Sequence, residues 1–177
     1  GGLVAANELR RRLPRTHKIV LIEKNPNHAF APSFLWVMTG SRKPEQIIKP
    51  IQSLIRNGID LFCDEVMSIN ISQRSVTISS QTLTYDYLVI ALGAELAPQL
   101  IPGLTGNAHS FYTFQEASKL EETLAGFAGE HIALVVGGLP YKCPGAPHEA
   151  AMLITDYFRQ RGSMKTVHLY TPESQPM

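Results

Sequence analysis

The segments Gly1-Gly-Leu-Val-Ala-Ala and Lys18-Ile-Val-Leu-Ile-Glu23 decide the fold of this chain. Apolar residues recur at helical spacing over residues 2–13, and Pro14 ends the predicted helix. The β-branched run 18–23 is typical of a strand buried on both faces of a parallel sheet. A glycine turn, a helix, a buried strand and an acid at the end of that strand form a dinucleotide-binding fingerprint.

Each part of this fingerprint has a physical task. Glycines let the backbone approach a pyrophosphate, the helix N-terminus stabilises its charge, and the acid bonds a ribose hydroxyl. Glu23 stands 21 residues after Gly2, close to the spacing of about 20 that the fingerprint requires. The strand and the glycines that should precede Gly2 are not in the chain. The half-motif therefore also fits a generic βαβ unit in which Gly1 and Gly2 only begin a helix.

The remaining pattern predicts a second unit of the same kind. Pro44 opens a predicted helix that ends at Gly58, and strand-like segments at 59–71, 75–79 and 83–92 form a meander. A Pro- and Gly-rich connection near residues 94–113 leads to a capping box at Thr113-Phe-Gln-Glu116, which begins a helix to about residue 127.

After Gly129, a strand at 131–136, a helix at 148–161 and a strand at 165–170 follow. We therefore predict an α/β protein with two βαβ-type units, the first carrying an inserted meander and the second cut off at the end of the chain.

Composition excludes several classes of protein. The 177 residues are 44% hydrophobic and 18% charged, and 16 Lys and Arg against 15 Asp and Glu leave a net charge of +1. This near-neutral charge does not indicate binding to nucleic acid, and two cysteines are too few for a fold held together by disulfides. No signal peptide is evident, and the apolar runs fall short of the roughly 20 residues of a membrane span. We expect any membrane contact to be peripheral.

The segment Thr84-Tyr-Asp-Tyr-Leu-Val-Ile-Ala-Leu-Gly93 resembles the Y-D-x-L-[VI]-[IV]-A-[TL]-G stretch of flavoproteins with two dinucleotide-binding domains. The resemblance implies a buried strand that leads into a glycine turn beside FAD, and it implies that Val66 passes along the adenine. A core strand that merely ends at a glycine is the alternative.

A second resemblance is more specific. Lys142-Cys-Pro-Gly-Ala-Pro-His-Glu149 resembles the K-C-x-G-A-P-x-E stretch of sulfide:quinone oxidoreductases and a related motif of flavocytochrome c sulfide dehydrogenases. The loop 30–40 resembles the one that passes the isoalloxazine in the former family. Prolines after Gly137-Gly138 lack the N–H groups that cradle phosphate, so the NAD(P)H site is expected to be lost.

These resemblances imply an organisation and a cofactor. They imply a three-layer Rossmann-like FAD-binding domain over residues 1–113, followed by part of a second Rossmann-like domain over 114–177, with the parent fold truncated at both ends. Because the FAD fold is incomplete, we expect the 177 residues alone to bind FAD weakly or not at all. The expected FAD-binding residues are Gly2, Glu23, Lys24, Pro32, Ser33, Val66, Ala91 and Gly93.

They also imply a redox site. Cys143 is the expected redox thiol, since Lys142 and the following helix N-terminus favour its thiolate. Glu149 is expected to accept a proton or to act only as a helix-terminal carboxylate. Cys63 is expected to be a small buried apolar residue. Cys143, His148 and Glu149 are not expected to bind metal, because no further Cys or His lies at zinc spacing.

The implied reaction passes electrons from sulfide, or a related thiol or sulfur compound, through FAD to a quinone or a cytochrome. The second redox cysteine of the family is not in this chain. Two alternatives therefore stay open: a type II NADH:quinone reductase-like flavoprotein, and a flavin-binding module without turnover.

Overall fold

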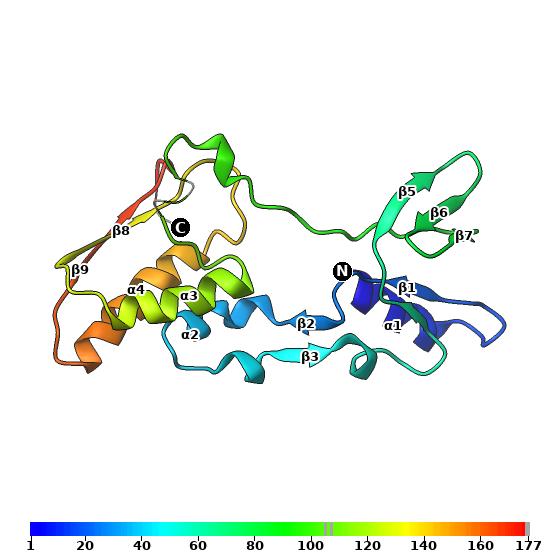
Figure 1. Cartoon of the computed structure of the whole chain (residues 1–177), viewed down its shortest axis with the longest axis horizontal. Coiled ribbons are helices and arrows are strands. Elements are labelled where there is room, and N and C mark those ends of the chain that lie inside the picture. The colour runs from blue at the N-terminus through cyan, green and yellow to red at the C-terminus, as the bar shows by residue number, and fades with distance from the viewer. Residues whose placement is uncertain (105, 107, 176–177) are drawn as a thin grey trace. The chain divides into compact units, whose positions relative to one another are not determined.

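The computed structural model describes residues 1–104, 106 and 108–175, and it forms two compact units (Figure 1). Unit 1 comprises residues 1–28 and 48–96. Unit 2 comprises residues 29–47 and the chain from residue 97 onward. Helices and strands occur in both units, so the predicted α/β class is confirmed. The predicted domain boundary at residue 113 stays a prediction.

Unit 1 contains a helix beside a parallel pair of strands. Helix α1 spans Gly2–Arg12, and β1 (Val20–Ile22) pairs with β4 (Asp60–Phe62). The Glu23 amide extends this ladder by donating to the Phe62 carbonyl at 3.0 Å. Strand β1 is shorter than the predicted 18–23 and only partly buried. The buried apolar residues beneath α1 are Ala6, Ile19 and Ile59.

The helix predicted from Pro44 to Gly58 is wrong. Residues 44–46 and 51–53 form single 3-10 turns, and β3 (Ile48–Pro50) between them pairs with β2 (Asn27–Ala29). Pro50 explains the difference, because it has no amide hydrogen to donate and disfavours helical backbone at the preceding residue. The apolar stripe is still used, since Ile47 and Ile51 are buried.

The predicted meander is confirmed as an antiparallel sheet of β5 (Val66–Asn70), β6 (Ser75–Ile78) and β7 (Thr82–Thr84). The predicted strand 59–71 is divided into β4 and β5. The predicted strand 83–92 ends at Thr84, and Tyr87 and Leu92 are 95% and 82% exposed. No strand of the described residues pairs with the segment after Thr84.

Unit 2 packs three helices against a second parallel pair of strands. These elements are α2 (Phe34–Met38), α3 (Phe114–Ala125), α4 (Ala146–Gln160), β8 (His131–Val135) and β9 (Thr166–Tyr170). Burial alternates along both strands, so one face is covered and the other is open. Ile132, Leu134 and Val167 lie on the covered face against the helical core.

The helix boundaries in unit 2 largely follow local sequence. The capping box is confirmed, because the Glu116 amide donates to Thr113 Oγ1 at 3.2 Å. Helix α4 begins two residues before the predicted start, at Ala146 with Pro147 in its first turn, where a missing amide hydrogen costs nothing. Among the described residues, no helix is long and apolar enough to cross a membrane.

The Asp64 carboxylate ties the break between β4 and β5 to the turn after β6. It accepts bonds from the Ser80 hydroxyl at 2.7 Å, the Ser80 amide at 3.0 Å and the Ser79 amide at 3.3 Å. These bonds lower the pKa of Asp64 to about 2, and the bond from the Ser80 side chain has the largest effect.

We expect Asp64→Asn to destabilise the protein at neutral pH. The folded-state pKa of Asp64 lies below the unfolded value of about 3.9, so its stabilisation is complete above that value and is lost as pH falls towards 2. Urea unfolding should therefore show a lower midpoint at pH 7 and a flatter acid decline for the variant. Asp86→Asn, at an exposed carboxylate, is the control; an equal effect there would contradict the assignment.

Candidate functional site

The N-terminus of α1 is an uncapped helix end. Gly1 is the N-cap residue, no side chain bonds the first amides, and the first turn contains no acidic residue. The end also lies close to the segment before Gly93, because a Cβ on Gly2 would be 3.5 Å from the Ala91 Cβ and 3.9 Å from Leu21 Cδ1. Gly2 and Ala91, predicted from separate motifs, are thus brought together.

Glu23 lies directly after β1, as the fingerprint requires. Its Oε1 accepts a hydrogen bond from the Asn25 amide at 3.0 Å, and the side chain is half-buried. The neighbouring Lys24 ammonium lies 3.9 Å from Glu65 Oε1, with both side chains more than 60% exposed. Such an exposed ion pair contributes little to stability, so Lys24 is free to contact a ligand.

Gly93 has left-handed backbone, with a φ of +78°, and no atom lies within 4 Å of where its Cβ would be. A ligand can therefore approach this backbone closely. Val66 is the first residue of β5 and is partly buried.

The chemistry of these groups fits the adenine nucleotide half of FAD. The uncapped amides of α1 suit a phosphate, the Glu23 carboxylate suits a ribose diol, and Gly93 leaves room for close approach. The individual binding roles stay predictions.

Pro32 and Ser33 lie in unit 2, in a 3-10 turn (Ala31–Ser33) that leads into α2. Ser33 is fully buried, and its Oγ accepts a hydrogen bond from Arg42 at 2.6 Å. The Arg42 guanidinium lies 4.8 Å from the centre of the Trp36 ring. The loop is therefore fixed internally, with Pro32 on its exposed side.

Cys143 is a free, exposed thiol at the start of α4. Its φ is +56°, and its carbonyl accepts a hydrogen bond from the Ala146 amide at 3.0 Å. Left-handed backbone costs a non-glycine residue roughly 1–2 kcal/mol, and such residues concentrate at functional sites. Glu149 lies in the first turn of α4.

The prediction that Cys63 is buried is wrong, because this residue is exposed. It follows the last residue of β4, in the break before β5. Among the described residues, no three His, Cys, Asp or Glu side chains form a group that could hold a metal ion.

Two tyrosines beside Cys143 were not among the predicted site residues. The Tyr141 hydroxyl donates to Glu173 Oε1 at 2.9 Å and contacts the Pro144 carbonyl at 3.2 Å, which braces the loop before α4. The Tyr112 hydroxyl is buried without a partner in the described part of the chain. Burial is the main cause that raises the pKa of Tyr112 to about 12, and electrostatic interactions with the nearby Cys143 and Tyr141 contribute less.

Tyr141 could have been found from sequence, since it lies next to the Lys142–Glu149 motif. Tyr112 and Glu173 have no such signal, because they are distant in sequence and meet the loop only through tertiary packing.

Residues 1–139 match the protein family described as pyridine nucleotide-disulphide oxidoreductase. The chain is 29% identical to the mitochondrial sulfide:quinone oxidoreductase of Mus musculus over 168 residues, which is 92% of this chain and 37% of the relative. It is 31% identical to the sulfide-quinone reductase of Aquifex aeolicus over 182 residues, covering 99% of this chain and 41% of the relative.

The crystal structure of the sulfide:quinone oxidoreductase from Aquifex aeolicus superposes with a TM-score of 0.82 at 26% identity, over 98% of this chain and 41% of that one. The Rossmann-like fold expected from the sequence is thereby confirmed. The chain spans about two fifths of the length of these relatives.

We expect Tyr112→Phe to stabilise the protein by about 1 kcal/mol, because it removes a buried hydroxyl that has no partner among the residues the structure describes. Tyr141→Phe is the matched control and should destabilise it, since it removes the bond to Glu173. Urea unfolding measures both. A loss of stability in the Tyr112 variant would show that its hydroxyl is satisfied.

Proposed function

The chain belongs to the pyridine nucleotide-disulphide oxidoreductase family, and from that premise we propose that it is part of an FAD-dependent oxidoreductase of the sulfide:quinone type. The family and the relatives above are FAD-binding flavoproteins. The substrates proposed are sulfide, or a related small thiol or sulfur compound, and a quinone.

The observation that carries this proposal is the placement of Cys143. An exposed thiol on left-handed backbone precedes a helix of 15 residues, in a loop held by Tyr141. The resemblance of the sequence around it to sulfide:quinone oxidoreductases supports the same proposal.

The proposed chemistry begins with sulfur uptake at Cys143. A Cys143 thiolate and a hydrosulfide ion join through a new S–S bond, giving a persulfide anion, one proton and two electrons. FAD, when bound, would supply the two-electron acceptor for this step and the link to the quinone. We assign Glu149, in the first turn of α4, to take the proton, and His148 beside it is the next candidate.

We propose that Gly2, Glu23 and Lys24 hold the nucleotide, that Val66 borders the adenine, and that Ala91 and Gly93 line its path. The loop at Pro32 and Ser33 is assigned to the isoalloxazine, with its conformation fixed by the Arg42 hydrogen bond.

A cytochrome is the other electron acceptor to be tested, and contact with a membrane surface is proposed as peripheral. Quinones partition into the bilayer, so an enzyme that reduces them benefits from such contact.

In the natural protein that carries this sequence, Cys143→Ser should abolish sulfide-driven flavin reduction, because serine forms no persulfide. Flavin bleaching on addition of sulfide, followed by absorbance, measures the effect. Cys63→Ser is the matched control, since both thiols are exposed, and it should retain full reduction. Unchanged bleaching in Cys143→Ser would refute the role of this thiol, and bleaching by NADH would favour the reductase alternative.

Glu23→Ala should lower FAD retention roughly tenfold or more, because a carboxylate bonded to a ribose hydroxyl is lost. The ratio of flavin to protein absorbance after gel filtration measures retention. Glu122→Ala, at an exposed carboxylate of α3, is the control. Equal retention in the wild type and in Glu23→Ala would mean that Glu23 does not bind the nucleotide.

A further inference from the structure

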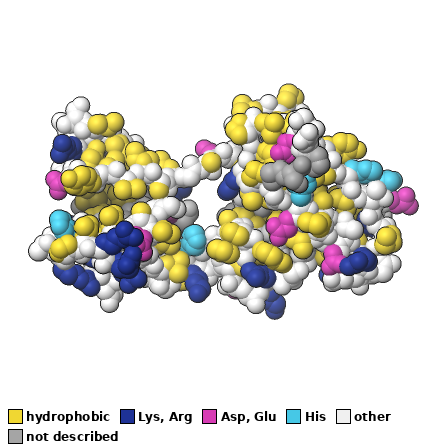
Figure 2. Space-filling view, turned by 180° about the vertical axis from the view of Figure 1, so that it is seen from behind, with side chains coloured by type: hydrophobic (Ala, Val, Ile, Leu, Met, Phe, Trp, Pro, Cys, Tyr) yellow, Lys and Arg dark blue, Asp and Glu magenta, His cyan; other side chains and the backbone are white. Residues whose placement is uncertain are grey.

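The C-terminal end of α1 and the turn before β4 form a second concave surface in unit 1. This arginine cleft encloses about 560 Å³ and is lined by Arg10, Arg11, Arg15, Ile55, Arg56 and Asn57. Figure 2 shows Lys and Arg side chains gathered on unit 1, at the left of the view. Helix α1 rises about 1.5 Å per residue, so the cleft lies some 15 Å from the glycine end that the proposed function uses.

Arg10 forms the floor of the cleft and is only 7% exposed. Its guanidinium donates to the carbonyls of Leu13 at 2.7 Å, Pro14 at 2.6 Å and His17 at 2.9 Å. These bonds hold the guanidinium beside the C-terminal end of α1, where its positive charge offsets the negative end of the helix dipole. The buried Nε of Arg10 has no partner among the described residues.

The turn that forms the other wall is held in place by Asn7. The Asn7 side chain donates to the Leu54 carbonyl at 2.8 Å and accepts from the Arg56 amide at 2.8 Å. Arg15 Nη1 donates to the Asn57 carbonyl at 2.6 Å. Gly58, with a φ of +90°, leaves the space that Arg15 and Arg10 occupy, because a Cβ there would collide with Arg15.

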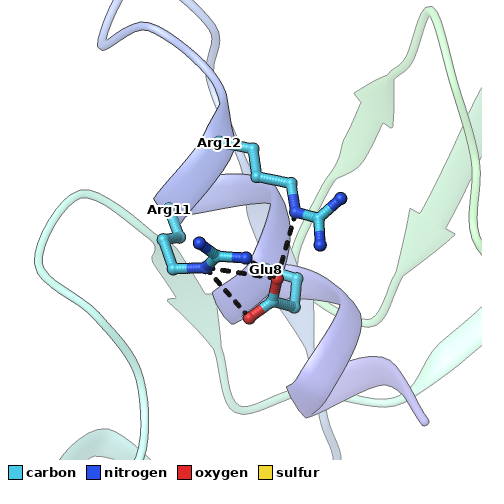
Figure 3. A network of polar contacts seen from close by, with 3 residues as sticks. All are labelled: Glu8, Arg11 and Arg12. Carbon is cyan, nitrogen blue, oxygen red and sulfur yellow. Dashed lines mark hydrogen bonds and ion pairs between the residues drawn. The ribbon is translucent and has the colours of Figure 1, made fainter.

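The positive charge of the cleft is poorly balanced. Glu8 bonds both Arg11, at 2.7 Å, and Arg12, at 3.1 Å, so one carboxylate serves two guanidinium groups (Figure 3). No carboxylate lines the cleft, and the Arg56 side chain has no ion-pair partner in the described residues. Of the four guanidinium groups that line the cleft, only that of Arg11 has a carboxylate partner in the described residues, and it shares this carboxylate with Arg12.

We propose that the arginine cleft binds a phosphate group. Guanidinium groups match phosphate oxygens with paired hydrogen bonds, and several of them around one concave surface favour a ligand with at least two negative charges. The walls are already held by Arg10, Asn7 and Arg15, so little ordering accompanies binding. The site is independent of the proposed redox function.

Two sources can supply the phosphate: a free phosphate compound or a phospholipid headgroup. The shared chemistry is a terminal phosphate of charge near −2. Pyrophosphate tests the first source. Vesicles of phosphatidylcholine with and without phosphatidic acid test the second.

The experiment titrates the full chain with pyrophosphate by calorimetry at low ionic strength, where charge interactions are least screened. The same chain is then sedimented with each kind of vesicle. The cleft variant is Arg15→Gln with Arg56→Gln. The single variant Arg56→Gln removes a guanidinium group that has no ion-pair partner in the described part of the chain, so we expect it to preserve the fold. Arg12→Gln with Arg74→Gln is the control, because it removes the same charge from unit 1 outside the cleft.

We expect pyrophosphate to bind, the double cleft variant to bind roughly tenfold more weakly, and the control to stay within about twofold. Binding to phosphatidic acid vesicles with the same dependence on Arg15 and Arg56 would support the proposal with a headgroup as the source. Absence of binding to both probes, or an equal loss in the control, would overturn it. Sulfide-driven flavin reduction should be unaffected in the cleft variant, which separates this site from the redox site.

Discussion

Hydrogen bonding between neighbouring strands is the constraint on which both units depend, because extended backbone cannot satisfy its own amides and carbonyls. In unit 1, β1 is a strand only where it faces β4, although the apolar run in the sequence is longer. In unit 2, β8 and β9 pair along five residues each, and the helices cover one face. The apolar segment after Thr84 meets no strand among the described residues, so its side chains are exposed.

Both ends of helix α1 in unit 1 carry groups that attract an anion, but these groups differ chemically. Its N-terminus has uncapped amides and small residues, which suit a phosphate at close range. Its C-terminus would repel an anion, but the buried Arg10 bonds the carbonyls of Leu13 and Pro14 just after the helix and adds positive charge there. The same helix therefore presents two positive ends, one made by backbone amides and one made by guanidinium groups.

In unit 2, the loop before α4 illustrates how a reactive side chain is held. Cys143 takes a backbone conformation that is unfavourable for its residue type, and it does so within a loop braced by Tyr141 and Glu173. The core beneath α4 is densely apolar, with Ala150 and Ile154 almost fully buried. Helix α4 thus follows a loop that holds an exposed thiol in a fixed conformation.

Local patterns in the sequence determined the boundaries of α1, α3 and α4, the order of the meander strands, and the positions of Glu23 and Cys143, because spacing and caps act over a few residues. Tertiary structure alone decided whether an apolar run became a strand, and it left Cys63 exposed and Tyr112 beside Cys143. It also brought Arg15 to Arg56 across some forty residues of chain. Strand pairing and side-chain burial depend on residues that are distant in sequence, so a local pattern cannot predict them.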